Sequence, residues 1–297
     1  MEKTKFSYVQ IGAKDYKALA DFYAKALGFV YCEDNSWLGG KEGICLKAPG
    51  FAVEDAPVFG FVPAVKGNIA KINDAGFAHT CYETNDVKAA VRNLLKYGGS
   101  IHSTMGKPEI HPCVYCKDPE GNVVEFHIPF PSEKSFGEIA NTASCLLGLK
   151  PEKKLRNGDA TGAIKFIHVN IICPDWEKLC GFYRNAFACV NVGKIKNHQG
   201  GYKEKVIGVA GVHVAGQHVL LPGFAKDYPT LEIFTYSIPG RDFACAENEL
   251  GINCIGFACD DKEVVAKKVV AAGGTINEKG EDYILVGDIQ NGKIILR

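Results

Sequence analysis

Two glutamates interrupt apolar segments of this chain, and two histidines open other strand-like segments. Glu125 lies in Val-Val-Glu-Phe and Glu232 in Leu-Glu-Ile-Phe, both typical of buried β-strands. A carboxylate that faces a protein core without a polar partner is costly. His79 and His168 stand near the beginning of their own segments. Taken singly, each histidine is more often a hydrogen-bonded structural residue than a ligand. Imidazole and carboxylate groups nevertheless bind transition metals and transfer protons, so these residues are candidates for chemistry.

The segments that carry these residues belong to an internal repeat. One spacing joins a strand, an aspartate seven positions on and a Phe-Tyr pair fourteen positions on; it occurs from Tyr8 to Asp15 and Phe22-Tyr23, and from His168 to Asp175 and Phe182-Tyr183. A second spacing has an aspartate ten positions after a glycine and a Gly-Gly pair further on; it occurs from Gly76 to Asp86 and Gly98-Gly99, and from Gly251 to Asp261 and Gly273-Gly274. The chain therefore contains four copies of one unit.

Each copy is expected to be a βαβββ unit. Leading strands are predicted at 5–12, 77–84, 165–172 and 252–259, and helices at 15–27, 86–97, 175–187 and 261–272. The four aspartates stand where the helices begin and are interpreted as N-caps. The fold class is α+β, built from four βαβββ modules. We place one domain at 1–131, a linker at 132–163 and a second domain at 164–297.

The repeat resembles the vicinal oxygen chelate superfamily, which includes glyoxalase I, bleomycin-resistance proteins and extradiol dioxygenases. The resemblance rests on His168 with Asp175 and Phe182-Tyr183, on Pro229-Thr-Leu-Glu232, on His79 with Asp86 and Gly98-Gly99, and on Asp118-Pro-Glu-Gly-Asn-Val-Val-Glu125. In this family two βαβββ units form a half-barrel cup around one divalent metal, and each unit supplies ligands from two of its strands. The resemblance therefore implies that the four modules form two half-barrel cups with helices outside. The resemblance implies ligand positions at Tyr8 and Gly60, His79 and Glu125, His168 and Glu232, and Cys254 and Leu296. Copies two and three are thus full, in that both of their ligand positions carry a metal-binding side chain, whereas copies one and four lack good ligands.

How the copies pair decides what the full positions mean. If copies adjacent in sequence pair, each cup holds half a site. If copy two pairs with three, and one with four, a single cup holds two histidines and two glutamates while the other holds none. We favour the second arrangement because it explains the division between full and empty copies.

The resemblance then implies a function. Two imidazoles and two carboxylates suit one divalent transition metal, namely Ni, Co, Zn or Fe, better than Ca. The implied activity is that of a lyase or isomerase of glyoxalase I type, with proton transfer next to a substrate oxygen held by the metal. Glu125 is the first candidate for the catalytic base and Glu232 the second.

Two other functions of the same fold remain open. One is a metal-free protein that binds or sequesters a small molecule, although such a cup needs no ligand set. The other is an extradiol dioxygenase, which needs two histidines and one glutamate within one pair of adjacent copies; the second half of the chain offers only His168 and Glu232.

Further polar residues have structural alternatives. Asn170 and His127 lie two positions beyond His168 and Glu125, so strand alternation places each on the face of its ligand. Each could contact substrate or serve as a structural hydrogen-bonding group. The Cys113-x-x-Cys116 pair lies in a strand-like run, which favours packing over a redox pair or half of a zinc site. His111, His198, His213 and His218 show no informative spacing.

Composition excludes several classes of partner. Lys plus Arg and Asp plus Glu each number 34, so the formal net charge is zero and no basic nucleic-acid footprint is evident. No apolar run is long enough to span a membrane, and no signal peptide is evident, so we expect a cytoplasmic protein whose twelve cysteines are free thiols. We expect a small-molecule substrate, and either a monomer with intramolecular domain pairing or a homodimer. The sequence does not indicate the substrate or whether glutathione takes part.

Overall fold

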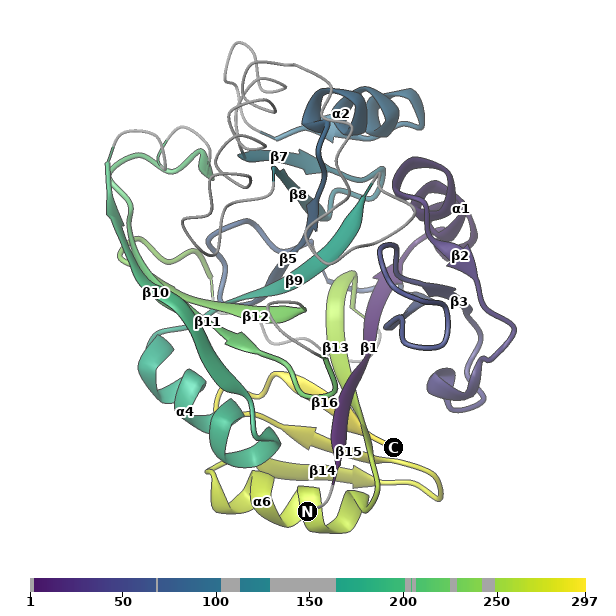
Figure 1. Ribbon diagram of the computed structural model, residues 1–297, viewed down its shortest axis with the longest axis vertical. Helices are drawn as coiled ribbons and strands as arrows, with labels where there is room; N and C mark the ends of the chain where they lie inside the picture. The colour runs from purple at the N-terminus through teal and green to yellow at the C-terminus, as the bar shows by residue number, and fades with distance from the viewer. Residues whose placement is uncertain are drawn as a thin grey trace.

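The structure, a computed structural model, describes residues 3–67, 69–102, 113–128, 164–200, 204, 207–224, 229–241 and 249–297. Over these residues the fold is α+β, with two sheets and helices on their outer sides, as predicted (Figure 1). The expected linker at 132–163 lies outside the described residues, and the division into domains at 1–131 and 164–297 stays a prediction.

Each module has the expected element order. Module 1 contains β1 (Thr4–Ala13), α1 (Tyr16–Leu27), β2 (Val30–Tyr31), the 3-10 turn η1 (Ser36–Leu38), β3 (Ile44–Lys47) and β4 (Val58–Pro63). Module 2 contains β5 (Gly76–Glu83), α2 (Val87–Lys96), β6 (Ser100–Ile101), β7 (Cys113–Lys117) and β8 (Val123–His127). Module 3 contains β9 (Lys165–Ile172), α4 (Trp176–Phe187), β10 (Val190–Gln199), β11 (His213–Leu220) and β12 (Thr230–Tyr236). Module 4 contains β13 (Gly251–Cys259), α6 (Lys262–Ala271), β14 (Thr275–Lys279), β15 (Ile284–Gly287) and β16 (Lys293–Leu296).

Strand pairing crosses the two halves of the sequence. One eight-stranded sheet has the order β14-β15-β16-β13-β1-β4-β3-β2, and the other has the order β10-β11-β12-β9-β5-β8-β7-β6. The first sheet joins modules 1 and 4 through the antiparallel pair β1–β13, and the second joins modules 2 and 3 through the antiparallel pair β5–β9. Both central pairs are visible in the middle of Figure 1. The pairing of copy two with three, and of one with four, is therefore confirmed.

The helices begin where the sequence predicts. Asp15, Asp86, Asp175 and Asp261 each accept a hydrogen bond from the backbone N–H three residues on. This contact satisfies a donor that the first helical turn leaves free. Gly28 ends α1 in the left-handed conformation at φ 77°, which a glycine adopts without steric cost.

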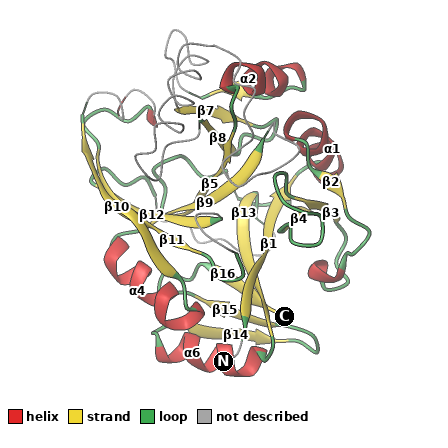
Figure 2. Cartoon of the chain, viewed as in Figure 1, coloured by secondary structure: helices red, strands yellow, loops and turns green. Residues whose placement is uncertain are grey.

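Helices pack within each half of the sequence, whereas sheets pair between halves. Helix α1 lies against α2, and α4 lies against α6 (Figure 2). The hydroxyl of Tyr23 on α1 donates to Asp118 of module 2 at 3.2 Å, and the hydroxyl of Tyr183 on α4 donates to Asp288 of module 4 at 3.1 Å. Each of these bonds ties a helix to the turn before the last strand of the next module.

A repeated Pro-Gly-Phe segment joins module 1 to module 3. The backbone N–H of Phe166 donates to Pro49 at 3.1 Å, and that of Phe6 donates to Pro222 at 3.0 Å. The rings that follow, Phe51 and Phe224, meet with centroids 5.7 Å apart. The two sheets are thus held together by a contact with approximate twofold symmetry.

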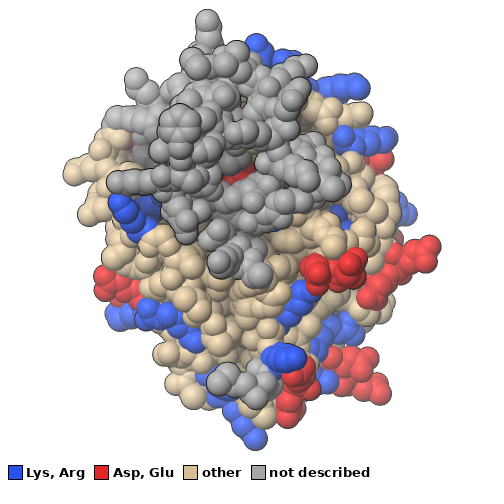
Figure 3. Space-filling model, in the orientation of Figure 1, with Lys and Arg blue, Asp and Glu red and all other residues tan. Residues whose placement is uncertain are grey.

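The described surface carries both signs of charge. In Figure 3 the Lys and Arg side chains are interspersed with Asp and Glu over the described part of the visible face. Within the described part of the chain, no helix combines the length and apolar character needed to cross a membrane.

Candidate metal centre

Four neighbouring strands of one sheet supply the candidate ligands. His79 lies on β5, Glu125 on β8, His168 on β9 and Glu232 on β12. Cys81 of β5 is the Cα partner of both Glu125 and His168, so the register brings these ligands to one level of the sheet. One ligand atom from each of the four buried residues lies within 4.8 Å of all the others. The sequence prediction that His79, Glu125, His168 and Glu232 converge agrees with this geometry.

The distances between donor atoms suit a single ion. His79 Nε2 lies 2.9 Å from Glu125 Oε2 and 3.8 Å from Glu232 Oε2. His168 Nε2 lies 3.5 Å and 3.4 Å from the same two oxygens. An ion with ligands at about 2.1 Å separates adjacent donors by about 3.0–3.4 Å. The four residues could therefore hold one metal ion.

One ring nitrogen supports this fit independently. His168 Nε2 is buried and has no hydrogen-bond partner among the described residues, although it is directed at the two carboxylates. A buried polar atom is rarely left without a partner. A cation between the carboxylates would accept the lone pair of this nitrogen.

Electrostatics keep the carboxylates available as ligands. Burial by itself raises the pKa of Glu125, but His168 and His79 outweigh it and hold this pKa well below its usual range. Burial is likewise outweighed at Glu232, whose pKa is lowered by His168 and His218. Burial lowers the pKa of His168, but Glu232 and Glu125 reverse this and raise it to about 9. Metal binding would thus displace a proton from His168.

Three side chains complete the group around the carboxylates. Asn170 Nδ2 donates to Glu232 Oε2 at 3.1 Å, which gives this residue a structural role near the site. His218 Nε2 lies 3.2 Å from Glu232 Oε1. The Cys113 thiol donates to Glu125 Oε1 at 2.8 Å. Sequence reasoning assigned no role here to His218 or Cys113, because both come from strands adjacent to the ligand strands and share no repeat position with them.

The remaining sequence candidates have structural surroundings. His127 Nδ1 donates to the carbonyl oxygen of Ile128 at 2.6 Å. Cys113 and Cys116 lie in different hydrophobic clusters: Cys113 packs on the side of the sheet that carries Glu125, and Cys116 packs in the core beneath the helices. The preference for strand packing over a redox pair is therefore confirmed.

The corresponding cup of the other sheet is filled by protein. Tyr8 is fully buried, and its ring stacks on Trp37 at a centroid distance of 5.1 Å. A Cβ atom at Gly60 would lie 2.1 Å from the Tyr8 hydroxyl. The tyrosine ring thus occupies the space of the missing side chain at position 60. Its hydroxyl donates to Gln10 at 3.1 Å, and Gln10 donates to Asn253 at 2.9 Å.

One ligand position in that cup was predicted wrongly. Ile295, and not Leu296, corresponds to Glu125, because Ile295 pairs with Gly256 just as Glu125 pairs with Cys81. Leu296 lies in the core on the helix side of the sheet, as Phe126 does. Neither Ile295 nor Leu296 can bind a metal through its side chain, so the conclusion about this cup is unchanged.

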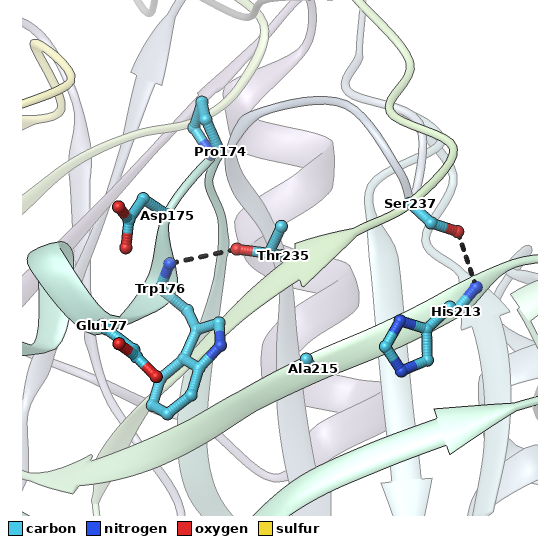
Figure 4. A pocket seen from close by; sticks show the side chains of 8 residues that line it. All are labelled: Pro174, Asp175, Trp176, Glu177, His213, Ala215, Thr235 and Ser237. Atoms are coloured by element: carbon cyan, nitrogen blue, oxygen red, sulfur yellow. Dashed lines mark hydrogen bonds between the residues drawn. The ribbon is translucent and has the colours of Figure 1, made fainter.

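A surface pocket of about 340 Å³ lies elsewhere, on the outer side of β11 and β12. Figure 4 shows its lining, which includes Trp176 and His213. Thr235 faces this pocket, whereas Glu232 faces the metal group, since residues an odd number of positions apart on a strand point to opposite faces. The pocket is therefore separate from the candidate centre.

Comparison with known proteins agrees with this geometry. Residues 5–126 match the Glyoxalase/Bleomycin resistance protein/Dioxygenase superfamily. Among curated proteins, no sequence matches the chain.

Solved structures share the fold over nearly the whole chain. Glyoxalase I from Zea mays is 15% identical, has a TM-score of 0.61, and is aligned over 99% of this chain and 92% of its own. A mutant of the same enzyme is 14% identical, has a TM-score of 0.64, and is aligned over 99% and 94%. A putative dioxygenase from Bacillus subtilis subsp. subtilis str. 168 is 15% identical, has a TM-score of 0.58, and is aligned over 100% and 86%. Identities this low show the fold alone. Residues 5–126 thus match the glyoxalase/bleomycin resistance/dioxygenase superfamily, and the four modules together have the fold of glyoxalase I.

Proposed function

We propose that the protein is a metal-dependent lyase or isomerase of glyoxalase I type, which transfers a proton to or from a substrate carbon next to a substrate oxygen. The observation that supports this most is the buried group of two histidines and two glutamates in one cup. The other cup is packed with Tyr8 and has no such group among its described residues. A protein that only sequesters a small molecule has no need for this difference between its cups.

The metal would be Ni, Co, Zn or Fe, held by His79, Glu125, His168 and Glu232. When bound, such an ion acts as a Lewis acid that polarises a substrate carbonyl and stabilises negative charge on its oxygen. The two carboxylates balance the charge of a divalent ion, and the histidines give the intermediate ligand softness that these metals prefer.

Glu125 is the proposed catalytic base, and Glu232 the second candidate. The hydrogen bonds around the two carboxylates support this order. Glu232 accepts from Asn170 and contacts His218, whereas Glu125 is approached outside the ligand group by the thiols of Cys113 and Cys81, which are weak donors. Glu125 is thus held less firmly and is the better placed of the two to take a proton from a substrate carbon.

Turnover assays with metal-loaded protein test the proposal. Protein loaded separately with Ni, Co, Zn and Fe would be assayed against hemithioacetals of several thiols and against acyl-CoA epimers, with chelated protein as control. We expect proton transfer with at least one metal and none after chelation. Oxygen consumption with catechols would indicate a dioxygenase instead. Tight binding of a small molecule by metal-free protein, without turnover under any of these conditions, would indicate a sequestering protein.

A further inference from the structure

We infer that His218 is a positioning residue that fixes Glu232 in the metal group, and that Thr230 in turn fixes the His218 ring. This inference rests on the proposed metal site and assigns to it two residues beyond the four ligands.

The register of the sheet places His218 beside the carboxylate. His218 on β11 is the Cα partner of Glu232 on β12. Its Nε2 lies 3.2 Å from Glu232 Oε1, and its side chain is only 19% exposed. Asn170 already donates to Oε2 of the same carboxylate at 3.1 Å. Both oxygens of Glu232 thus have a nitrogen donor, which limits rotation of the carboxylate.

Thr230 determines which ring nitrogen can donate. His218 Nδ1 lies 3.0 Å from Thr230 Oγ1. In a neutral imidazole one nitrogen carries the hydrogen and the other accepts. If the threonine hydroxyl donates to Nδ1, the hydrogen stands on Nε2 and is directed at Glu232. Thr230, His218 and Glu232 then form a chain in which each group orients the next.

The equivalent position near Glu125 differs in chemistry. Tyr115 is the Cα partner of Glu125, and its ring lies edge-on to His79 at a centroid distance of 5.3 Å. The His218 ring lies edge-on to His168 at 5.4 Å. Each ligand histidine is therefore flanked by a ring from the strand two places away in the sheet, but only the ring at 218 brings a nitrogen to a carboxylate of the metal group, that of Glu232. Because of this difference, we expect the carboxylate of Glu232 to be held in one orientation.

Metal affinity of the full chain tests this inference. His218→Phe keeps a flanking ring and removes both nitrogens. We expect about 10–100-fold weaker binding of Zn²⁺ or Co²⁺, the range for loss of a group that orients a ligand. The measurement is competition with a chromophoric chelator, together with the visible absorption spectrum of the Co²⁺-loaded protein, which should change. Neither readout depends on substrate turnover.

Two sets of variants separate positioning from a general structural role. His218→Gln can still direct an N–H group at Glu232 and should recover most of the affinity, and Thr230→Ser should bind metal better than Thr230→Val. His213→Phe is the matched control, because His213 lies on the same strand but faces the outer pocket in Figure 4. It should leave affinity and spectrum unchanged.

Unchanged affinity and spectrum in His218→Phe would overturn the inference, and so would an equal loss in His213→Phe or no recovery in His218→Gln. If His218→Phe does not fold, the comparison of Thr230→Val with Thr230→Ser decides, and equal affinities there overturn the inference. Wild-type protein that binds no metal would contradict the proposed function itself. Wild-type protein that binds metal only as tightly as His218→Phe would contradict the role of His218 alone.

Discussion

At the residue scale, the four candidate ligands could be predicted from the sequence, because they are polar residues at repeated positions of strand-like segments. Glu125 and Glu232 stand in apolar strands, and His79 and His168 stand at matching positions of two copies. The roles of His218 and Cys113 could not be predicted in this way. They reach the carboxylates from the neighbouring strands β11 and β7, where the residue types are not repeated: His218 pairs with Glu232, whereas Tyr115 pairs with Glu125.

Replacement of the proposed base should separate chemistry from folding. In Glu125→Gln, turnover by metal-loaded protein should fall by about 10²–10⁴-fold, since a neutral amide cannot accept the proton. The far-ultraviolet circular dichroism spectrum should stay the same. Cys254→Ala, at the position of the packed cup that corresponds to His79, is the control and should keep full turnover. Full turnover by Glu125→Gln with metal bound would exclude Glu125 as the base.

At the element scale, the sequence predicted the helices better than the last hairpin. The four helix starts follow from aspartates that accept backbone N–H groups, which is a local interaction. The alignment of the final strand failed by one residue. Asn291 takes the left-handed conformation at φ 65° where module 2 uses Gly121 at φ 100°, so Gly292 corresponds to Asn122. The predicted alignment uses glycine as the marker of this turn, although an asparagine can also adopt the left-handed conformation.

Helix α1 should lose stability in a pH-dependent way when its tyrosine hydroxyl is removed. Burial raises the pKa of Asp118 to about 6, above its value of about 3.9 in an unfolded chain. The ionised form of Asp118 therefore costs stability above pH 6, and this cost disappears as the pH falls through about 6 toward 4. The Tyr23 hydroxyl offsets part of the cost, because its hydrogen bond favours the ionised form.

Tyr23→Phe should accordingly destabilise the protein by about 1–3 kcal/mol at pH 7.5 and by less at pH 5. Urea unfolding of wild type and variant at both pH values measures the difference. Tyr31→Phe is the control, since Tyr31 is 56% exposed, and it should have little effect. A penalty for Tyr23→Phe that is equal at the two pH values, or larger at pH 5, would show that this hydrogen bond does not depend on ionised Asp118.

At the scale of the whole molecule, the sequence favoured the observed pairing of modules but could not establish it. The division between full and empty ligand positions indicated that module 2 pairs with 3, and the sheets agree. The contact between modules 1 and 3 was missed, although its signal was present: Pro49-Gly50-Phe51 recurs as Pro222-Gly223-Phe224. The repeated tripeptide has no chemistry of its own, and its role depends on two sheets that meet only in the folded chain.

A side chain at Gly223 should weaken the contact between the sheets. Gly223 has φ +89°, and a Cβ there would lie 2.3 Å from Lys5 Cγ. Gly223→Ala should lower the free energy of unfolding by about 1–3 kcal/mol more than Gly193→Ala, because overpacking adds to backbone strain. Gly193 is a matched control with φ +69° and nothing within 4 Å of its Cβ position. Equal losses in the two variants would show that the Lys5 contact does not restrict residue 223.

Removal of metal should lower thermal stability, because the ion would join strands from both halves of the sequence. An ion present at about 100 times its dissociation constant contributes about 2.7 kcal/mol. In a chain of this size that corresponds to a Tm lower by about 4 °C after chelation. Differential scanning calorimetry with and without chelator measures the shift. His168→Ala should show no response to chelator, and a wild-type Tm that is insensitive to chelation would argue against a structural contribution of the metal.

The metal content of the purified full chain tests the central claim most directly. Elemental analysis of protein purified without chelator should find one divalent transition metal per chain. His79→Ala and His168→Ala, from different halves of the sequence, should each lose that same ion, whereas Cys254→Ala should retain it. A single centre formed by modules 2 and 3 would be contradicted by two ions per chain, or by no bound metal after reconstitution with Ni, Co, Zn and Fe. It would also be contradicted if each histidine variant lost only part of the bound metal.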